Sequence, residues 1–281
     1  MPKKTRGKVR VVRQAYPVRI SASYKAFLVA LQRAQNKRMA TLLASKTAVL
    51  EAFAGITLRL DAEAWETELE RIIAEMQLSE SVTASVFARA KADGEKVLRH
   101  VSNQLVQVTE NRAVPVVLGA QAVPSNASII NSWAAENVRL IKRVNDDQRA
   151  RIASIISNTF RKGGRISAAK EELKATFGMG TKRADLIAQN EIGNLYANLE
   201  KAEQQRLGVD YYQWDTRMDE RVRPSHKAMQ GKFCRWDDPT VYKDSLDDAN
   251  WKNRADIGGV IAHPSEAIRC RCHAGAVLQL D

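Results

Sequence analysis

The side chains best suited to chemistry gather near the end of this 281-residue chain. The stretch after residue 225 holds three of the four histidines and all three cysteines: His226, His263, His273, Cys234, Cys270 and Cys272. Thiolate and imidazole are ligands that zinc prefers in tetrahedral protein sites. In a strand, Cys270 and Cys272 would point to the same face, where two histidines or Cys234 could complete a site.

The spacing of these ligands differs from the paired knuckles of familiar zinc modules. A pair of buried thiols, or a disulfide formed later in an oxidising environment, would use the same residues without a metal. We therefore predict His226, His263, Cys270 and Cys272 as candidate metal ligands. A structural zinc ion is the cofactor that this set suggests, and nothing in the sequence requires one.

A second group of polar residues, Asp219-Glu-Arg-Val-Arg-Pro-Ser-His226, places an acid, two guanidinium groups and an imidazole close together. His226 acting as a base that Asp219 orients would be a catalytic arrangement. No nucleophile motif accompanies it: the sequence has no Gly-x-Ser-x-Gly, no His-Glu-x-x-His and no phosphate-binding glycine-rich loop. An arginine held by Asp219 and capped by His226 would instead brace the fold. We favour the brace, predict no catalytic residues and expect that the protein is not an enzyme.

The elements that position these residues follow from the apolar pattern. Apolar residues recur at three- and four-residue steps through the first two-thirds of the chain, which predicts helices, one of them ending at Gly178 and the next capped by Thr181. Aromatic and β-branched residues at 209–216 predict a strand, residues 224–230 a short helix, and residues 269–280 one or two closing strands. The fold class expected is a mainly α N-terminal and central part with a small α+β C-terminal module.

The chain divides into five predicted segments. These are a basic flexible arm at 1–20, a helical domain at 21–110, a linker at 111–128, a central helical part at 129–208 and the α+β module at 209–281. The arm carries much of the net charge of +12 and has no acidic residue. It can bind nucleic-acid phosphates or remain a solvated tail. The candidate nucleic-acid contacts are Lys3, Lys4, Arg6, Lys8, Arg10 and Arg13.

No apolar run approaches the roughly 18 residues of a membrane span, and the N-terminus has no apolar stretch that could serve as a signal peptide. We therefore expect the protein to begin in a cytoplasm, with its cysteines reduced.

The order of motifs in the last third resembles a known family. Trp214-x-Thr216, Asp219-x-Arg221-x-Arg223-x-x-His226 and Gly231-Lys232 together resemble the C-terminal signature of Mu F-like phage head morphogenesis proteins. The run His263-Pro264-x-Glu266-Ala267-Ile268-Arg269-Cys270-Arg271-Cys272 is similar to the closing segment of that family. The resemblance covers roughly residues 129–277. Its structural motif comprises Trp214, Asp219, Arg221, Arg223, His226, Gly231, Pro264, Cys270, Arg271 and Cys272.

This chain departs from the family's pattern at two places. Some members carry Cys in place of Arg223 and Cys or His at position 226, which with Cys270 and Cys272 would make a four-ligand set. Arg223 cannot ligate a metal. Members often have Arg-Thr where this chain has Gln189-Asn190.

The resemblance implies a minor head or capsid protein of a tailed bacteriophage, acting in head morphogenesis at the portal vertex and in DNA packaging or ejection. The implied partners are the portal protein, the inner capsid or scaffold, and packaged DNA through the basic arm, with no membrane before ejection. The implied location is inside the virion head near the portal vertex, and the host cytoplasm during assembly. Two other functions fit the composition: a nucleic-acid-binding protein that uses arm and body, and a metal-dependent hydrolase or toxin-like enzyme.

Overall fold

The computed structural model describes residues 8–57, 64–109 and 124–280. Its contacts divide the chain into two compact units that interleave along the sequence. Unit 1 consists of residues 1–21, 91–133 and 189–281, and unit 2 consists of residues 22–90 and 134–188. The consecutive domains predicted from the sequence do not match these units, because the long helices continue from one unit into the other.

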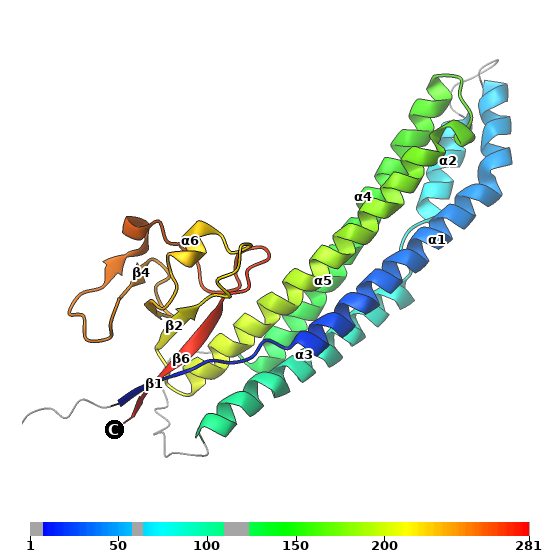
Figure 1. Ribbon diagram of the computed structural model, residues 1–281. Helices are drawn as coiled ribbons and strands as arrows, with labels where there is room; N and C mark the ends of the chain where they lie inside the picture. Colours follow the sequence, from blue (N-terminus) through cyan, green and yellow to red (C-terminus); the bar gives the residue numbers. More distant parts are fainter. Residues whose placement is uncertain (1–7, 58–63, 110–123, 281) are drawn as a thin grey trace, which may run out of the picture. The chain divides into compact units, whose positions relative to one another are not determined.

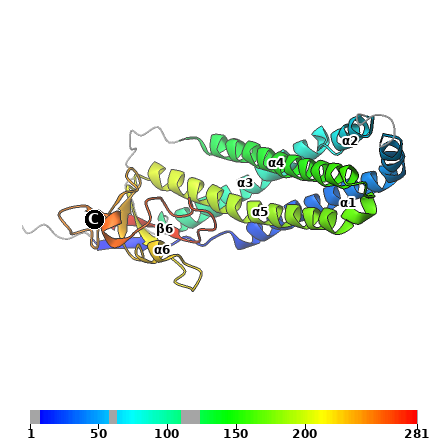
Figure 2. The ribbon, with the colours of Figure 1, turned by 90° about the horizontal axis from the view of Figure 1, so that it is seen from above.

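Helices make up most of the N-terminal and central parts, as predicted. They are α1 (Val18–Thr57), α2 (Ala64–Glu75), α3 (Glu80–Thr109), α4 (Asn126–Arg161) and α5 (Lys170–Arg206), with a short 3-10 turn η1 (Ile166–Ala169) before α5. The predicted linker lies largely outside the described residues, and its last three residues belong to α4. The helices α4 and α5 run antiparallel and side by side (Figure 1, Figure 2). None of the described helices has the length and apolar character that a membrane span needs.

The core of unit 2 is built from the apolar stripes that the sequence shows. Leu50, Trp65, Ile72 and Ile156 are buried in one cluster, and the rings of Trp65 and Phe160 meet edge to face at 5.4 Å. Such an edge-to-face pair adds to the stability gained from burial.

A buried polar network explains why α5 does not stop at Gly178. The side-chain amide of Gln148 accepts a hydrogen bond from Gln32 at 2.6 Å and donates one to Asn36 at 3.0 Å. A Cβ at Gly180 would lie 2.3 Å from the Gln148 amide nitrogen, so this glycine makes room for the network. The predicted helix end at Gly178 and the predicted cap at Thr181 are therefore wrong, because α5 continues through both.

Unit 1 contains a four-stranded antiparallel sheet in the order β1-β6-β2-β3. Its strands are β1 (Lys8–Val12), β2 (Tyr211–Asp215), β3 (Phe233–Arg235) and β6 (His273–Leu280). A second, two-stranded sheet pairs β4 (Val241–Tyr242) with β5 (Lys252–Asn253), and two short turns, α6 (Pro224–Lys227) and η2 (Arg254–Ile257), complete the module. The predicted small α+β C-terminal module is thus confirmed.

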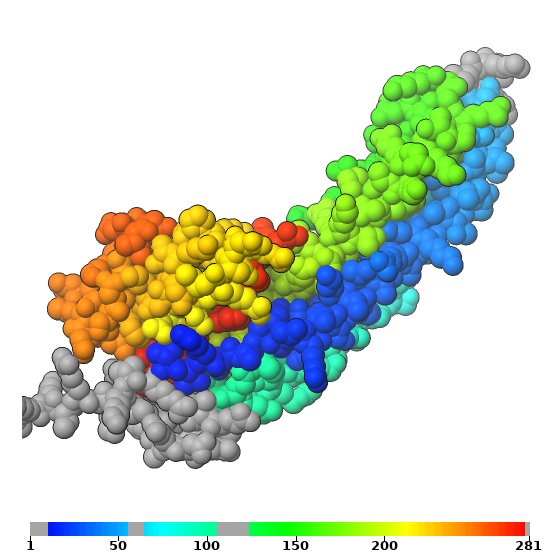
Figure 3. Space-filling model, viewed as in Figure 1, coloured from blue at the N-terminus to red at the C-terminus, as the bar shows by residue number. Residues whose placement is uncertain are grey.

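The first described residues belong to this sheet, so the predicted flexible arm over residues 1–20 is wrong from residue 8 onward. Strand β1 pairs with β6 along its whole length, and its residues lie directly against the C-terminal ones in the space-filling view (dark blue against red; Figure 3). Val12 is buried with Val209, Ala276 and Leu278. Alternating valines and an otherwise open edge of β6 account for this pairing.

Candidate functional site

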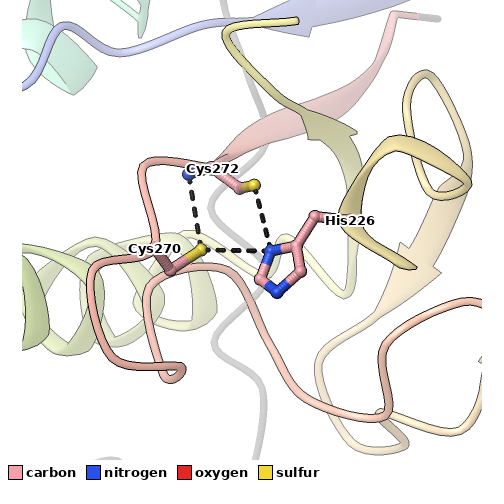
Figure 4. A group of neighbouring side chains, drawn as sticks. All are labelled: His226, Cys270 and Cys272. Carbon is pink, nitrogen blue, oxygen red and sulfur yellow. Dashed lines mark hydrogen bonds between the residues drawn. The ribbon is translucent and has the colours of Figure 1, made fainter. Parts of the chain in front are cut away.

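Three of the four predicted metal ligands meet at one place in unit 1. His226 Nδ1 lies 3.4 Å from Cys272 Sγ and 3.5 Å from Cys270 Sγ (Figure 4). The three ligand atoms all lie within 4.8 Å of one another. We call His226, Cys270 and Cys272 the triad.

Two short segments position the triad. His226 lies on α6, whose first residue is Pro224, and its ring meets that of Trp214 edge to face at 5.9 Å. Cys270 and Cys272 lie in the loop immediately before β6. The expectation that both thiols belong to a strand is therefore wrong, and the loop itself brings the two sulfur atoms together.

The two thiols share a proton unequally. A hydrogen bond from Cys272, together with the backbone N–H groups of Cys272 and Ser265, lowers the pKa of Cys270 below its ordinary value. The same contact with Cys270, and burial, raise the pKa of Cys272. Cys270 is thus the thiol of the pair that ionises more readily, and thiolate is the form in which cysteine ligates metals and acts as a nucleophile.

The other two candidate ligands have structural roles elsewhere. His263 Nδ1 lies 2.9 Å from the Tyr212 hydroxyl, and burial lowers the pKa of His263 to about 4. Cys234 is completely buried in the module core, where desolvation raises the pKa of its thiol to about 11. His263 was predicted as a ligand, and the structure does not bring it to the triad.

The predicted brace is present with a different arginine. Arg271 donates two hydrogen bonds to the carboxylate of Asp219, at 2.6 and 2.5 Å. The hydrogen bond from Arg271 holds the pKa of Asp219 below its usual value. Arg223 donates to the carbonyl of Ile268 at 2.7 Å instead, and His226 belongs to the triad, so neither residue takes part in the ion pair.

The remaining motif residues shape the chain around the triad. The backbone of Gly231 adopts a φ of 75° and donates to the carbonyl of Trp214 at 2.8 Å, which links the end of the α6 segment to β2. Such a positive φ favours glycine. Pro264 is buried.

The structure describes only some of the candidate nucleic-acid residues. Lys3, Lys4 and Arg6 lie outside the described residues, and of Lys8 and Arg10 only the backbone in β1 is described. Arg13 forms an ion pair with Asp215 at 3.4 Å while its side chain stays 62% exposed. Contact between these residues and nucleic acid stays a prediction.

The triad lines a cavity of about 690 Å³ in unit 1. The cavity is lined by five arginines and by polar residues, with no acidic side chain among them. The arginines are Arg217, Arg221, Arg223, Arg269 and Arg271. Sequence reasoning missed Arg217, which directly follows Thr216, and it named Arg269 within the closing segment but not as a site residue.

Comparison with known proteins identifies this part of the chain. The family model described as "Phage Mu protein F like protein" matches residues 150–275. These residues are a Mu F-like region. It begins within α4 and ends in β6, so it includes the triad and the Asp219–Arg271 ion pair. The resemblance inferred from the sequence motifs is thereby confirmed for residues 150–275.

A relative from Haemophilus influenzae carries the name "Uncharacterized protein". It is 24% identical over 149 residues, which are 53% of this chain and 29% of that protein. The chain therefore spans less than a third of the relative's length. No solved structure matches the chain.

The departures of this Mu F-like region from the family's pattern lie at the cavity. Gln189 and Asn190 both line it, and the Asn190 side-chain oxygen accepts a hydrogen bond from the backbone N–H of Arg269 at 3.0 Å. Arg269 has a φ of 58°, which non-glycine residues seldom adopt. The contact with Asn190 fixes this strained residue at the cavity wall.

Another residue that sequence reasoning missed holds the Mu F-like module together from inside. Arg254 is completely buried and donates to the carbonyls of Val241 and Ala262, at 3.0 and 2.7 Å, and to the Tyr212 hydroxyl at 3.1 Å. Backbone carbonyls thus take the place of an acidic partner. No local sequence pattern distinguishes such an arginine from an exposed one, because its acceptors come from distant segments.

Proposed function

We propose that this protein is a structural component of a tailed-phage head and acts in head morphogenesis. The observation that carries the proposal is the match of residues 150–275 to the Mu F-like family. We place its action at the portal vertex, where it contacts the portal protein and the inner capsid or scaffold. In this role the protein works through its surfaces, as an assembly factor without catalytic turnover.

The use of polar groups in the module supports a structural role. The strongest candidate for an acid–base pair, Asp219 with His226, is separated into two different contacts. Asp219 forms an ion pair with Arg271, and the buried Arg254 donates hydrogen bonds to backbone carbonyls. Charge networks of this kind commonly stabilise small folds, which makes a scaffold a better interpretation than a hydrolase.

Deletion of the gene in the phage that encodes it tests this proposal. We expect the protein in gradient-purified particles by mass spectrometry, and fewer filled heads by electron microscopy when it is missing. Complementation with the wild-type chain restores filled heads. Absence of the protein from both proheads and virions, with normal head counts after deletion, contradicts the proposal.

We also propose that the basic N-terminal residues contact packaged DNA. Because β1 starts at Lys8, the informative variant changes only Lys3, Lys4 and Arg6 to glutamine and leaves the sheet intact. A variant with Arg99→Gln, an exposed arginine on α3, is the matched control. Loss of DNA binding at low salt in the triple variant alone supports this role, and equal binding by both variants contradicts it.

The third part of the proposal is that the triad binds zinc as a structural ion. Two sulfurs and an imidazole nitrogen within 4.8 Å of one another are a donor set suited to that ion, and the lowered pKa of Cys270 favours the thiolate that binds it. When bound, zinc would join α6 to the loop before β6 and stabilise the module. Only three ligands come from the described residues, so the remaining position is left to solvent or to a molecule in the cavity.

Metal analysis of the purified chain tests the zinc site. We expect about one zinc ion per chain and a lower unfolding temperature after treatment with a chelator. The variant Cys272→Ser loses the ion, whereas Cys234→Ser, at a buried cysteine outside the triad, keeps it. A wild-type chain that takes up no zinc from solution, or equal zinc in both variants, overturns the assignment.

A further inference from the structure

The cavity beside the triad has an unusual concentration of positive charge. Five of its lining residues are arginines, and none is acidic. Two of these guanidinium groups have partners in the fold: Arg271 pairs with Asp219, and Arg223 donates to the carbonyl of Ile268. The side chains of Arg217, Arg221 and Arg269 form no hydrogen bond or ion pair with any other residue that the structure describes.

Arg217, Arg221 and Arg269 are all exposed, so solvent screens part of their mutual repulsion, but no acidic side chain lines the cavity to neutralise them. An anion in the cavity would relieve this repulsion.

We propose that this cavity binds the phosphate group of a nucleotide-sized ligand. Guanidinium groups match phosphate oxygens in shape and charge and donate paired hydrogen bonds to them. Arg217 and Arg221 come from the segment after β2, while Arg269 comes from the loop before β6. Asp215 at the end of β2 pairs with His273 at the start of β6, so the two segments that carry the three arginines meet the sheet at the same end.

The dimensions and the remaining lining fit a ligand larger than phosphate alone. Pockets for small molecules usually measure about 300–1,000 Å³, and this one measures about 690 Å³. Gln189, Asn190 and Ser265 supply amide and hydroxyl groups, and the ring of Tyr16 adds an aromatic wall. Such groups can hydrogen-bond to a sugar or base and stack against it.

The backbone around the cavity is held in place before any ligand arrives. Ser265 and Arg269 both have positive φ values, 69° and 58°. The Ser265 hydroxyl donates to the carbonyl of Cys272 at 3.2 Å, and the Arg269 N–H donates to Asn190. Strained residues that the surrounding structure fixes are common at binding sites, because a preformed site loses less freedom on binding.

Titration calorimetry of the full chain with adenosine monophosphate tests the proposal. We expect saturable binding that weakens with salt, measurable competition by inorganic phosphate, and no binding of adenosine, which lacks the phosphate. Replacing Arg217 or Arg269 with glutamine should weaken binding about tenfold or more, because each removes a charged hydrogen bond. Arg99→Gln, an exposed arginine of unit 1 outside the cavity, should leave the affinity unchanged.

A single-stranded oligonucleotide, with and without a 5′ phosphate, distinguishes a free nucleotide from the end of a nucleic-acid strand. Binding of the monophosphate supports the cavity as a small-molecule site. Binding of the oligonucleotide alone overturns it in favour of a nucleic-acid surface. No binding of the monophosphate or of phosphate at millimolar concentration overturns it, as does equal binding by Arg99→Gln and both cavity variants. Failure here leaves the role in head assembly untouched, since that role rests on particle composition.

Discussion

A buried carboxyl group on α5 gives the sharpest test of the structure. Glu200 is 1% exposed and lies beside the Tyr196 hydroxyl, with an oxygen separation of 3.4 Å. Burial raises its pKa to about 8, although contacts with Tyr196 and the backbone of Ala274 partly oppose the rise. Replacing it with glutamine keeps the shape of the side chain and removes the ionisable group.

The size and sign of the effect follow from this pKa. In the unfolded chain Glu200 loses its proton near its ordinary pKa of 4.5, whereas in the folded chain it keeps the proton up to about 8. The native state therefore binds more protons between these two values, and its free energy of unfolding falls as the pH rises through that interval. At about 1.4 kcal/mol for each pH unit, the total loss above pH 8 is up to about 5 kcal/mol.

Differential scanning calorimetry across this interval measures the effect. The unfolding temperature of the wild-type chain should fall more steeply with pH than that of Glu200→Gln, and the variant should be the more stable of the two above pH 8. Glu95→Gln, at an exposed position on α3, should follow the wild-type curve. Parallel curves for the wild type and Glu200→Gln would show that Glu200 ionises normally, which would refute the burial argued for it.

Two further substitutions test how the C-terminal module is held together. Arg254→Lys should lower the free energy of unfolding by about 3 kcal/mol or more, because the buried ammonium group cannot reach all three oxygen acceptors at once. Tryptophan fluorescence during chemical denaturation measures this loss. Gly275→Val should detach β1, since even a Cβ at this position would lie 2.8 Å from the Val11 side chain, and amide hydrogen exchange at residues 8–12 would then be fast. Unchanged protection of these amides would contradict the pairing of β1 with β6.

Local sequence patterns predicted the helices because an apolar stripe repeats within each helix and needs no knowledge of distant residues. They failed where distant contacts decide the structure. Gly178 and Thr181 suggested a helix end and a new cap, yet α5 is continuous through both, and Gly180 between them serves the packing of Gln148. Basic residues near the N-terminus suggested a free arm, yet the same stretch supplies β1, whose partner strand lies at the opposite end of the sequence.

The candidate site, like the fold, could be predicted where local chemistry decides and not where distant contacts decide. The thiols and His226 could be grouped from ligand chemistry alone, and the structure brings those three together. His263 could not be separated from them, because its partner Tyr212 is recognisable only in the folded chain. The cavity was not foreseen either, since which arginines are paired and which are free depends on acceptors in other segments.

The tripeptide Cys270-Arg271-Cys272 explains why the two halves of the Mu F-like signature occur together. Its middle residue, Arg271, pairs with Asp219 across 52 positions, and the flanking Cys270 and Cys272 meet His226 across 44 and 46 positions. The loop before β6 is thus joined to the segment around α6 by an ion pair, by a thiol–imidazole cluster and by the hydrogen bond from Arg223 to the carbonyl of Ile268. The half-exposed ion pair alone contributes little, because solvent screens it. The buried cluster and the Arg223 hydrogen bond therefore add to the ion pair, and a zinc ion bound at the cluster would strengthen the connection between the two halves of the signature.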